Sequence, residues 1–395
     1  MTTVPAPGAG RVPIPATVLA ILAKLEEAGY ETWCVGGAIR DFLLGDPQAD
    51  VDLATAAPPQ EVRRLFRRTV PVGLAHGTIG VLDDDDVLHE VTTFRRDVHT
   101  DGRHAVVEFG VSLDEDLARR DFTINAIAWH PLRDAWRDPY GGRDDIARRL
   151  VRAVGDPDAR FREDRLRILR ALRFAARFDF TIEAATWAAA QQQVGDTARL
   201  SAERVREEWW KAVASARDPR AVIRWWHQAG VDAIWFAGSG ARDVADHLAA
   251  ETLRDPVLLL AAWRSPVEPV LRRLKASGSD LARGRAIDRG PAAPASTAPV
   301  DVRRWMAAVG GAVDDLVRLA GTAAWVAQVQ RVRERGEATS RAELALTGDD
   351  LIAAGVAEPG PSLGATLAAL LEAVLEDPSR NTAEALLDLA RSRRP

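Results

Sequence analysis

Residues 34–55 read CVGGAIRDFLLGDPQADVDLAT, and they predict the order of the first secondary-structure elements. The apolar segment TWCV at 32–35 runs directly into Gly36 and Gly37, which predicts a strand that ends in a tight turn. The following AIRDFLL predicts a helix, and DVDLAT at 50–55 alternates in polarity as a second strand would. The stretch therefore predicts a strand, a glycine turn, a helix and a strand in succession.

The flanking sequence extends this pattern into a mixed α/β domain of about 145 residues. Residues 15–29 and 58–66 predict helices, the second with proline at its start. Residues 70–95 predict strands, with Asp83–Asp86 at a hairpin tip. The segment DFTINAIAWH at 121–130 predicts a strand or helical segment beside the sheet.

After Asp145 the pattern becomes helical. RFREDRLRILRALRFAARF at 160–178 predicts one continuous helix, and helical spacing continues through most of the remaining chain. A segment rich in Gly, Ala, Pro and Ser at 276–299 predicts a linker or an exposed loop. The whole chain is thus expected to be an α+β protein.

The composition is that of a globular protein. The 395 residues are 47% hydrophobic and 28% charged, with a net charge of −5, which allows roughly two to four domains. Cys34 is the one cysteine, so an internal disulfide is excluded and a reducing, cytoplasmic location is expected. No apolar run is long enough for a membrane span. Residues 148–177 hold ten Arg against four acidic residues, which favours a nucleic-acid partner.

Asp50 and Asp52 alternate on one strand, so both carboxylates are expected on one face. Two neighbouring carboxylates repel each other unless a cation lies between them, and Mg²⁺ takes carboxylates together with phosphate oxygens. Gly36 and Gly37 would let backbone N–H groups approach an anion. Each motif also has a simpler interpretation, a solvated strand end for the aspartates and an ordinary strand-to-helix turn for the glycines.

Glu90 is a third candidate carboxylate. It lies in the otherwise apolar strand segment LHEVTTFR, and a strand beside the first two would bring it to the metal site. The alternative is an ion pair with Arg95 at a sheet edge. The sequence leaves both interpretations open.

Several motifs in order resemble the class II, bacterial-type tRNA nucleotidyltransferases, or CCA-adding enzymes, of the poly(A) polymerase-like superfamily. GGAIRDFLLG with DVDLAT resembles the family's catalytic motif, and RRDFTINAIA (119–128) resembles its ribose and triphosphate motif. DPYGGRDDI (138–146), EDRLRILRALRFAARF (163–178) and LSAERVREE (200–208) resemble the hinge, nucleotide-selecting and helix-stabilising motifs. The resemblance covers residues 15–235 and 345–390.

The resemblance implies a polymerase-β-like nucleotidyltransferase head of α/β structure followed by all-helical neck, body and tail domains. The expected parts are a disordered N-terminal segment (1–14), the catalytic head (15–147), the neck with the nucleotide-selecting motif (148–215), the body (216–300) and a tRNA-binding tail (301–395).

The resemblance also implies the reaction, which is template-independent transfer of CMP and AMP from CTP and ATP to the 3′ end of tRNA. Asp50, Asp52 and Glu90 would be catalytic, and the two aspartates would hold two Mg²⁺ ions. The expected partners are tRNA, CTP and ATP, without DNA or a membrane. An A-adding enzyme or a poly(A) polymerase is the alternative, although VPVGLAHGTIGVL (70–82) is similar to the tRNA enzymes of the family.

Asp164 and Arg167 are expected three residues apart on one helical face. Asp accepts and Arg donates hydrogen bonds, so the pair suits the amino group and bare ring nitrogen that cytosine and adenine share. A surface salt bridge is the alternative. The resemblance implies further nucleotide-binding residues, which are Gly36, Gly37, Arg40, Arg120, Asp121, Asn125, Arg160 and Arg170. It also implies a flexible loop that contains Asp101, Gly102 and Arg103.

Overall fold

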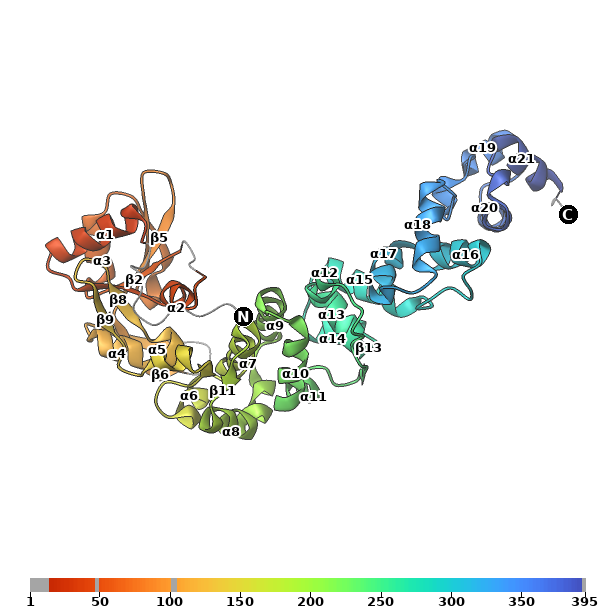
Figure 1. The fold of residues 1–395 in the computed structure, drawn as a ribbon. Helices are drawn as coiled ribbons and strands as arrows, with labels where there is room; N and C mark the ends of the chain where they lie inside the picture. The colour runs from red at the N-terminus through yellow and green to blue at the C-terminus, as the bar shows by residue number, and fades with distance from the viewer. Residues whose placement is uncertain (1–13, 47–49, 101–104, 393–395) are drawn as a thin grey trace. The chain divides into compact units, whose positions relative to one another are not determined.

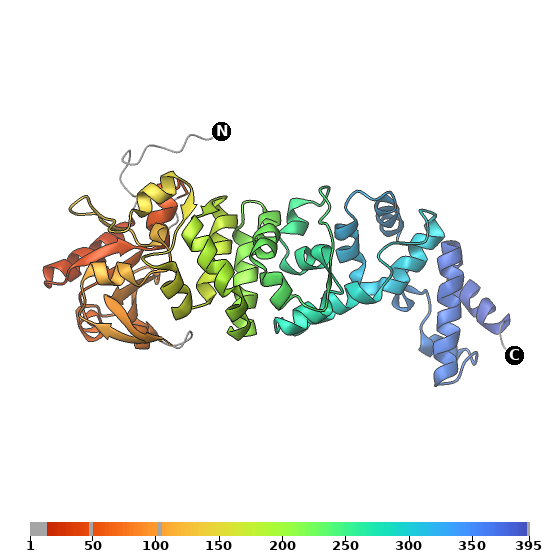
Figure 2. The same ribbon diagram turned by 90° about the horizontal axis from the view of Figure 1, so that it is seen from below.

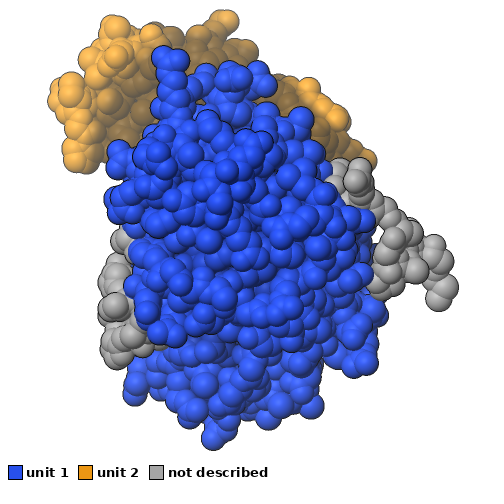
Figure 3. Space-filling model, turned by 90° about the vertical axis from the view of Figure 1, so that its left-hand side faces the viewer, with its two compact units in different colours: residues 1–235 blue, residues 236–395 orange. Residues whose placement is uncertain are grey.

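The computed structural model describes residues 14–46, 50–100 and 105–392. The chain forms two compact units, residues 1–235 and 236–395 (Figure 3). This boundary falls inside the expected body, and the finer division into neck, body and tail stays a prediction. The expected disordered segment, except its last residue, and the flexible loop with Asp101, Gly102 and Arg103 lie outside the described residues. In the described part of the chain, no helix combines the length and apolar character that a membrane crossing requires.

A seven-stranded sheet forms the centre of the first unit (Figure 1). Its strands, in spatial order, are β3 (Thr69–Gly73), β4 (Thr78–Leu82), β5 (Leu88–Thr93), β2 (Asp52–Thr55), β1 (Thr32–Val35), β8 (Ala128–His130) and β9 (Ala135–Arg137). All neighbours are antiparallel except β2 and β5, which are parallel. A separate hairpin pairs β6 (Arg95–Thr100) with β7 (Ala105–Phe109).

Helices cover the sheet and build its core. The helices α1 (Ala16–Glu27) and α3 (Pro59–Leu65) pack against its strands. Trp33 and Ala54 pack in one hydrophobic cluster with Leu117 of α4 (Leu113–Ala118). The helix α2 (Gly37–Leu43) follows β1 directly, and Gly36 joins them at a φ of 84°. The predicted strand, glycine turn, helix and strand are therefore confirmed.

Helices form the remainder of unit 1 (Figure 2). They are α5 (Gly142–Ala147), α6 (Pro157–Glu163), α7 (Leu166–Phe178), α8 (Ala184–Gln193), α9 (Ala202–Ser215), α10 (Pro219–Ala229) and α11 (Val231–Trp235), with a short parallel pair of strands, β10 (Leu150–Val151) and β11 (Thr181–Ile182). The prediction of one helix over residues 160–178 is wrong, because the chain extends at Asp164 between α6 and α7.

Unit 2 is helical apart from two very short strands. Its elements are β12 (Gly240–Ala241), α12 (Ala250–Leu253), α13 (Pro256–Trp263), β13 (Arg264–Ser265), α14 (Glu268–Arg273), α15 (Gly278–Arg289), α16 (Pro299–Val309), α17 (Val313–Ala320), α18 (Val326–Glu334), α19 (Gly348–Ala353), α20 (Pro361–Glu376) and α21 (Ala383–Ser392).

The prediction of a linker at 276–299 is wrong for its first half, which is α15. Ser277 caps this helix by accepting a hydrogen bond from the backbone N–H of Asp280 at 3.1 Å. Gly284 permits close packing on α14, because a Cβ there would lie 2.5 Å from Leu271 Cδ1. The glycine is thus a packing residue within a helix and does not mark a loop.

Candidate active site

The glycine turn lies directly beside Asp52. A Cβ on Gly36 would be 3.1 Å from Asp52 Oδ2 and 3.6 Å from Arg120 Nη1, and the positive φ would strain any other residue. The turn therefore brings backbone close to an acidic and a basic side chain. This arrangement leaves room for an anion to approach the chain closely.

The sheet register aligns the predicted carboxylates. Leu53 pairs with Val91 in the parallel β2–β5 ladder, so Glu90 lies beside Asp52 one position earlier. Although Asp52 opens to solvent, the surrounding protein partly desolvates it, and this effect, with the negative charges of Glu90 and Asp50, raises its pKa to about 6 against the opposing effect of Arg120. The cluster thus disfavours full ionisation when no cation is present.

The carboxylates suit a metal that takes its other ligands from the substrate. Within residues 14–46, 50–100 and 105–392, no three His, Cys, Asp or Glu side chains are grouped to hold a metal ion. Asp50 and Asp52 offer two carboxylates, and Mg²⁺ typically takes one or two carboxylates together with substrate phosphates. Glu90 lies beside this pair without completing a three-residue group.

Arg120 is fixed by a residue that the sequence reasoning missed. Its Nη2 lies 3.3 Å from Asp116 Oδ2, and its Nη1 donates to the backbone oxygen of Asn125 at 3.2 Å. Asp116 is only 1% exposed and also accepts from Arg119 Nε at 2.9 Å. The sequence did contain a signal for this role, because Asp116 lies on the helix that directly precedes Arg119 and Arg120.

Asp121 holds Arg170 in place. Its Oδ2 accepts from Arg170 Nε at 2.8 Å, while its Oδ1 accepts from the backbone of Phe122 and from Asn125 Nδ2, both at 2.8 Å. Burial alone would raise the pKa of Asp121, but Arg170 and these hydrogen bonds outweigh it and lower the pKa to about 2. Asp121 is therefore an ionised anchor for a cavity arginine.

Arg40 is buried and links three elements. It is 4% exposed, donates from Nη1 to Asn125 Oδ1 and pairs with Asp41 at 2.8 Å. Asp41 in turn pairs with Arg177 of α7 at 3.0 Å. The guanidinium of Arg40 also lies 4.9 Å from the ring centroid of Phe178. Arg40 thus ties α2 to the turn at Asn125 and to α7.

Asp164 and Arg167 do not share a helical face, which corrects the expectation from their spacing. Asp164 is extended at φ −148° and ψ 106°, and its Oδ1 accepts from the backbone N–H of Leu166 at 3.0 Å. Such local bonds let Asp compete with continuous helix. Arg167 Nη1 lies 2.9 Å from Glu163 Oε2, and the charged partner of Asp164 is Arg204 of α9, at 2.9 Å.

One cavity of about 500 Å³ in unit 1 brings most of the predicted residues together. Its lining consists of Gly36, Gly37, Arg40, Asp52, Arg119, Arg120, Asp121, Asn125, Asp164, Arg167, Arg170, Arg173, Phe174 and Arg177. Seven arginines against three aspartates make it strongly positive, as a polyanionic ligand requires.

Among the predicted residues that the structure describes, three are not in this lining: Asp50, Glu90 and Arg160. Arg160 donates to the backbone oxygen of Ala118 at 3.1 Å and pairs with Glu163 at 2.6 Å. The lining also contains four residues that the sequence reasoning did not assign, Arg119, Arg173, Phe174 and Arg177. The last three follow Arg170 at steps of three, four and seven along α7, a spacing that could have identified them.

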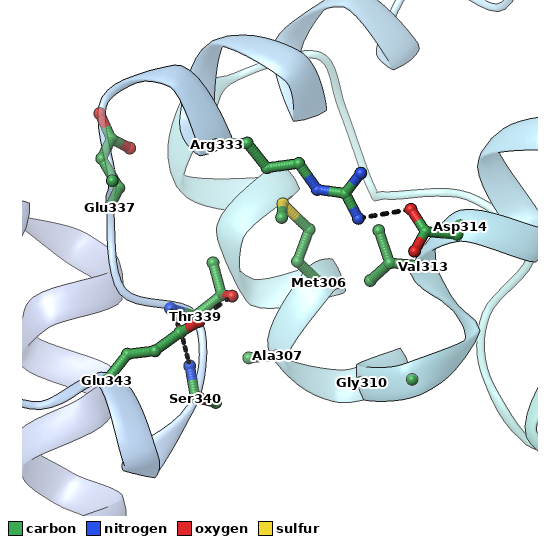
Figure 4. A pocket seen from close by; sticks show the side chains of 12 residues that line it. Met306, Ala307, Gly310, Val313, Asp314, Arg333, Glu337, Thr339, Ser340 and Glu343 are labelled. Atoms are coloured by element: carbon green, nitrogen blue, oxygen red, sulfur yellow. Dashed lines mark hydrogen bonds and ion pairs between the residues drawn. The ribbon is translucent and has the colours of Figure 1, made fainter.

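A second cavity, of about 520 Å³, lies in unit 2 and holds none of the predicted site residues (Figure 4). Arg333 reaches across it to Asp314, with 2.6 Å between Nη2 and Oδ1. Glu343 Oε2 accepts from the backbone N–H groups of Thr339 and Ser340 at 2.7 and 2.9 Å. These contacts join parts of the helical unit, and we assign the cavity no chemistry.

Known proteins resemble the chain over nearly its whole length. The family model described as "Poly A polymerase head domain" matches residues 32–152, and "Probable RNA and SrmB- binding site of polymerase A" matches 179–227. The CCA-adding enzyme of Leuconostoc citreum is 36% identical, and that of Lactiplantibacillus plantarum is 33% identical, each over 94% of both chains. The crystal structure of the Bacillus stearothermophilus CCA-adding enzyme in complex with CTP superposes with a TM-score of 0.76 at 31% identity, covering 95% of this chain and 96% of that one.

Proposed function

The chain belongs to the family of CCA-adding enzymes, and from this premise we propose how its residues add C, C and A to the 3′ end of tRNA from CTP and ATP. The cavity of unit 1 supports the proposal best, since it has Asp52 and the glycine turn among its lining residues together with Asp164 and Arg167. A single space thus contains the groups for phosphate chemistry and those for reading a base.

The triphosphate is proposed to bind between the glycine turn and the cavity arginines. Gly36 lets the backbone approach the phosphates, while Arg120 and Arg170 are held ready by Asp116 and Asp121. Arginines positioned in this way supply charge without reorganising during the reaction. Binding would therefore orient the α-phosphate beside Asp52, where the RNA hydroxyl attacks.

Asp50 and Asp52 are proposed to hold Mg²⁺, two ions in all. When bound, Mg²⁺ makes the 3′-hydroxyl of the RNA more acidic and neutralises charge on the leaving pyrophosphate. Burial is the largest cause of the raised pKa of Asp52, and the negative charges of Glu90 and Asp50 add to it. These charges support the assignment, because they favour a bound cation as they favour a proton. Glu90 extends the acidic surface toward the attacking hydroxyl and is proposed to be catalytic as well.

Asp164 and Arg167 are proposed to choose the base. The Asp164 carboxylate accepts from the amino group that cytosine and adenine share, and Arg167 donates to the neighbouring ring nitrogen. Uracil and guanine present a carbonyl and a ring N–H in those places, so both contacts would be lost. Each unsatisfied buried group costs about 1–3 kcal/mol, which is enough for strong discrimination without a template.

The experiment is incubation of the pure protein with tRNA that lacks CCA, Mg²⁺, CTP and ATP. Extension by three nucleotides supports the proposal, and no extension refutes it. Omission of CTP separates this reaction from A addition or polyadenylation, because those two reactions need only ATP. The names of the relatives, which are CCA-adding enzymes, do not favour these alternatives. Asp52→Ala should abolish incorporation and leave the fold intact. We place the reaction in the cytoplasm, where the buried thiol of Cys34 stays reduced.

A further inference from the structure

Exposed apolar side chains gather on one face of the β3–β4–β5 edge of the sheet. Val70, Val72 and Leu88 are 40, 46 and 39% exposed. Gly80 lies between them, and a Cβ there would come within 2.6 Å of Leu88 Cδ1 and 2.9 Å of Val72 Cγ2. Val72 and Leu88 therefore close over the glycine. We call Val70, Val72 and Leu88 the edge patch.

The edge patch is on the same face of the sheet as the catalytic carboxylates. Val70 pairs with Gly80, and Gly80 pairs with Glu90. The parallel β2–β5 register continues this row to Asp52. Residues paired across neighbouring strands point to the same face, and strands lie ~4.8 Å apart. Leu88 is on β5, directly beside β2 with Asp52, and Val70 and Val72 are on β3, three strands or ~14 Å away.

The nucleotide cavity lies on the opposite side of Asp52 along this row. The next strand is β1, where Val35 pairs with Asp52 and leads into Gly36, which lines the cavity. In nucleotidyl transfer the attacking and leaving oxygens lie in line, on opposite sides of the phosphorus. With the triphosphate on the Gly36 side, the RNA hydroxyl approaches from the Glu90 side.

We infer that the edge patch binds the terminal nucleotide of the RNA acceptor by apolar contact with its ribose and base. This inference rests on the proposed function. The acceptor end changes after each addition, so a surface that must hold it in every round cannot rely on hydrogen bonds specific to one base. Unpaired RNA ends can be splayed out, and every base offers a flat face for sequence-tolerant contact.

The clustering of exposed apolar groups favours a binding role over chance. Seven large apolar side chains are exposed in the described part of the chain. Five of them lie in β3, β5 or next to their ends, namely Val70, Val72, Leu74, Val87 and Leu88. Gathered exposed apolar surface marks interaction sites, whereas scattered residues do not. Continuity with the carboxylate row identifies the RNA end as the occupant.

The first test compares Val72→Thr/Leu88→Gln with the matched control Leu132→Gln. Leu132 is 55% exposed in the turn between β8 and β9, at the other edge of the sheet. At saturating CTP, kcat/KM for tRNA lacking CCA should fall about tenfold in the double variant, which corresponds to about 1.4 kcal/mol. The control should match the wild type, and CTP binding without RNA, measured by equilibrium dialysis, should be unchanged in both.

The second test uses the wild-type protein, so it does not depend on how the variants fold. A tRNA whose terminal nucleotide carries a photoreactive thiopyrimidine should form adducts at residues 70–72 or 88, located by mass spectrometry. Adducts confined to other segments, or unchanged kinetics in the double variant, would overturn the inference. A change of mass in light scattering with unchanged kinetics would assign the patch to a second copy of the chain and also overturn it. If wild-type protein extends no RNA, the proposed function fails first.

Discussion

Arg204 of α9, rather than Arg167, holds the carboxylate of Asp164. Its Nη2 lies 3.0 Å from Oδ1 and 2.9 Å from Oδ2. Charge-assisted contacts of this kind are strong and fix the direction of a carboxylate. Arg204 is absent from the cavity lining, so under the proposed function it would act on a bound base through Asp164.

Arg204→Ala should therefore reduce base discrimination more than catalysis. Without the pair, Asp164 can rotate away from the amino group of the base. The preference for CTP and ATP over UTP and GTP should then fall about tenfold. The measurement is kcat/KM for incorporation of each of the four nucleotides. Arg204→Lys should recover part of the preference.

The control for this prediction is Arg199→Ala. Arg199 is 73% exposed at its side chain and lies 3.5 Å from Asp196, so its loss should leave discrimination unchanged. Equal discrimination in wild type and Arg204→Ala would show that Asp164 needs no support from α9.

Glu90→Gln should stabilise the metal-free protein at neutral pH and still inactivate it. Burial, and after it the negative charge of Glu90, raises the pKa of Asp52 to about 6. The folded state therefore binds a proton more tightly than the unfolded chain, and stability decreases as pH rises from about 4 to about 6. Removal of the Glu90 charge should therefore restore part of the lost stability above pH 6.

Thermal melting in chelator at pH 4.5 and 7.5 measures this effect. The variant should melt higher than wild type only at pH 7.5, while incorporation with Mg²⁺ falls at least about 100-fold. Glu358→Gln, at an exposed position in unit 2, is the control and should change neither property. A Glu90→Gln protein that melts lower at both pH values would contradict the electrostatic account.

The local parts of the head could be predicted from sequence because their causes are local. An apolar strand that meets Gly36 must turn, since φ at this position is positive. Alternation predicted Asp50 and Asp52 on one strand, but β2 begins at Asp52, so Asp50 lies ahead of the strand and outside the cavity lining. The cavity also contains ten of the thirteen described residues predicted for the site, because the motifs that carry them form neighbouring elements.

Contacts between distant segments could not be predicted. The Asp164–Arg204 pair spans 40 residues, and no periodicity connects its members. The break between α6 and α7 contains neither Gly nor Pro, so the sequence pattern predicted a continuous helix. The helix is interrupted because the side chain of Asp164 accepts a hydrogen bond from the backbone N–H of Leu166. The helix α15 was not predicted because its segment is rich in Gly, Ala, Pro and Ser, although Ser277 supplies an N-cap.

Gly142→Ala should strongly destabilise unit 1. A Cβ at this position would lie 2.1 Å from the backbone oxygen of Thr123 and 2.8 Å from Ile127 Cγ1. Relief of this overlap requires α5 to move away from the turn that carries Asn125, at a cost of about 3 kcal/mol or more. The melting temperature and the affinity for CTP should both decrease.

Gly195→Ala provides the matched control. A Cβ at Gly195 meets nothing within 4 Å, and its φ is not in the left-handed region. This variant should melt within about 1 °C of the wild type, since substitutions away from such features change stability little. Similar losses in both variants would show that backbone flexibility, rather than the close approach at Gly142, explains the effect.

Asp121→Asn should weaken both stability and nucleotide binding, because Asp121 is the ionised anchor of Arg170. The variant keeps the shape of the side chain and loses its charge, which leaves Arg170 with the longer ion pair to Glu208, at 3.8 Å. The free energy of unfolding at pH 7 should fall by about 2 kcal/mol, the value that corresponds to the lowered pKa of Asp121. KM should rise for CTP and ATP alike, because the proposed role of Arg170 is to bind the triphosphate rather than the base.

The pH dependence separates charge from packing in this prediction. The pKa of Asp121 is lowered to about 2, so its ionic contribution is present above about pH 4 and is lost as pH falls toward 2. Urea unfolding should show a clear difference between wild type and Asp121→Asn at pH 7 and a smaller one at pH 3. The exposed Asp144→Asn should show almost no difference at pH 7. An Asp121→Asn deficit of equal size at both pH values would mean that shape, not charge, holds Arg170.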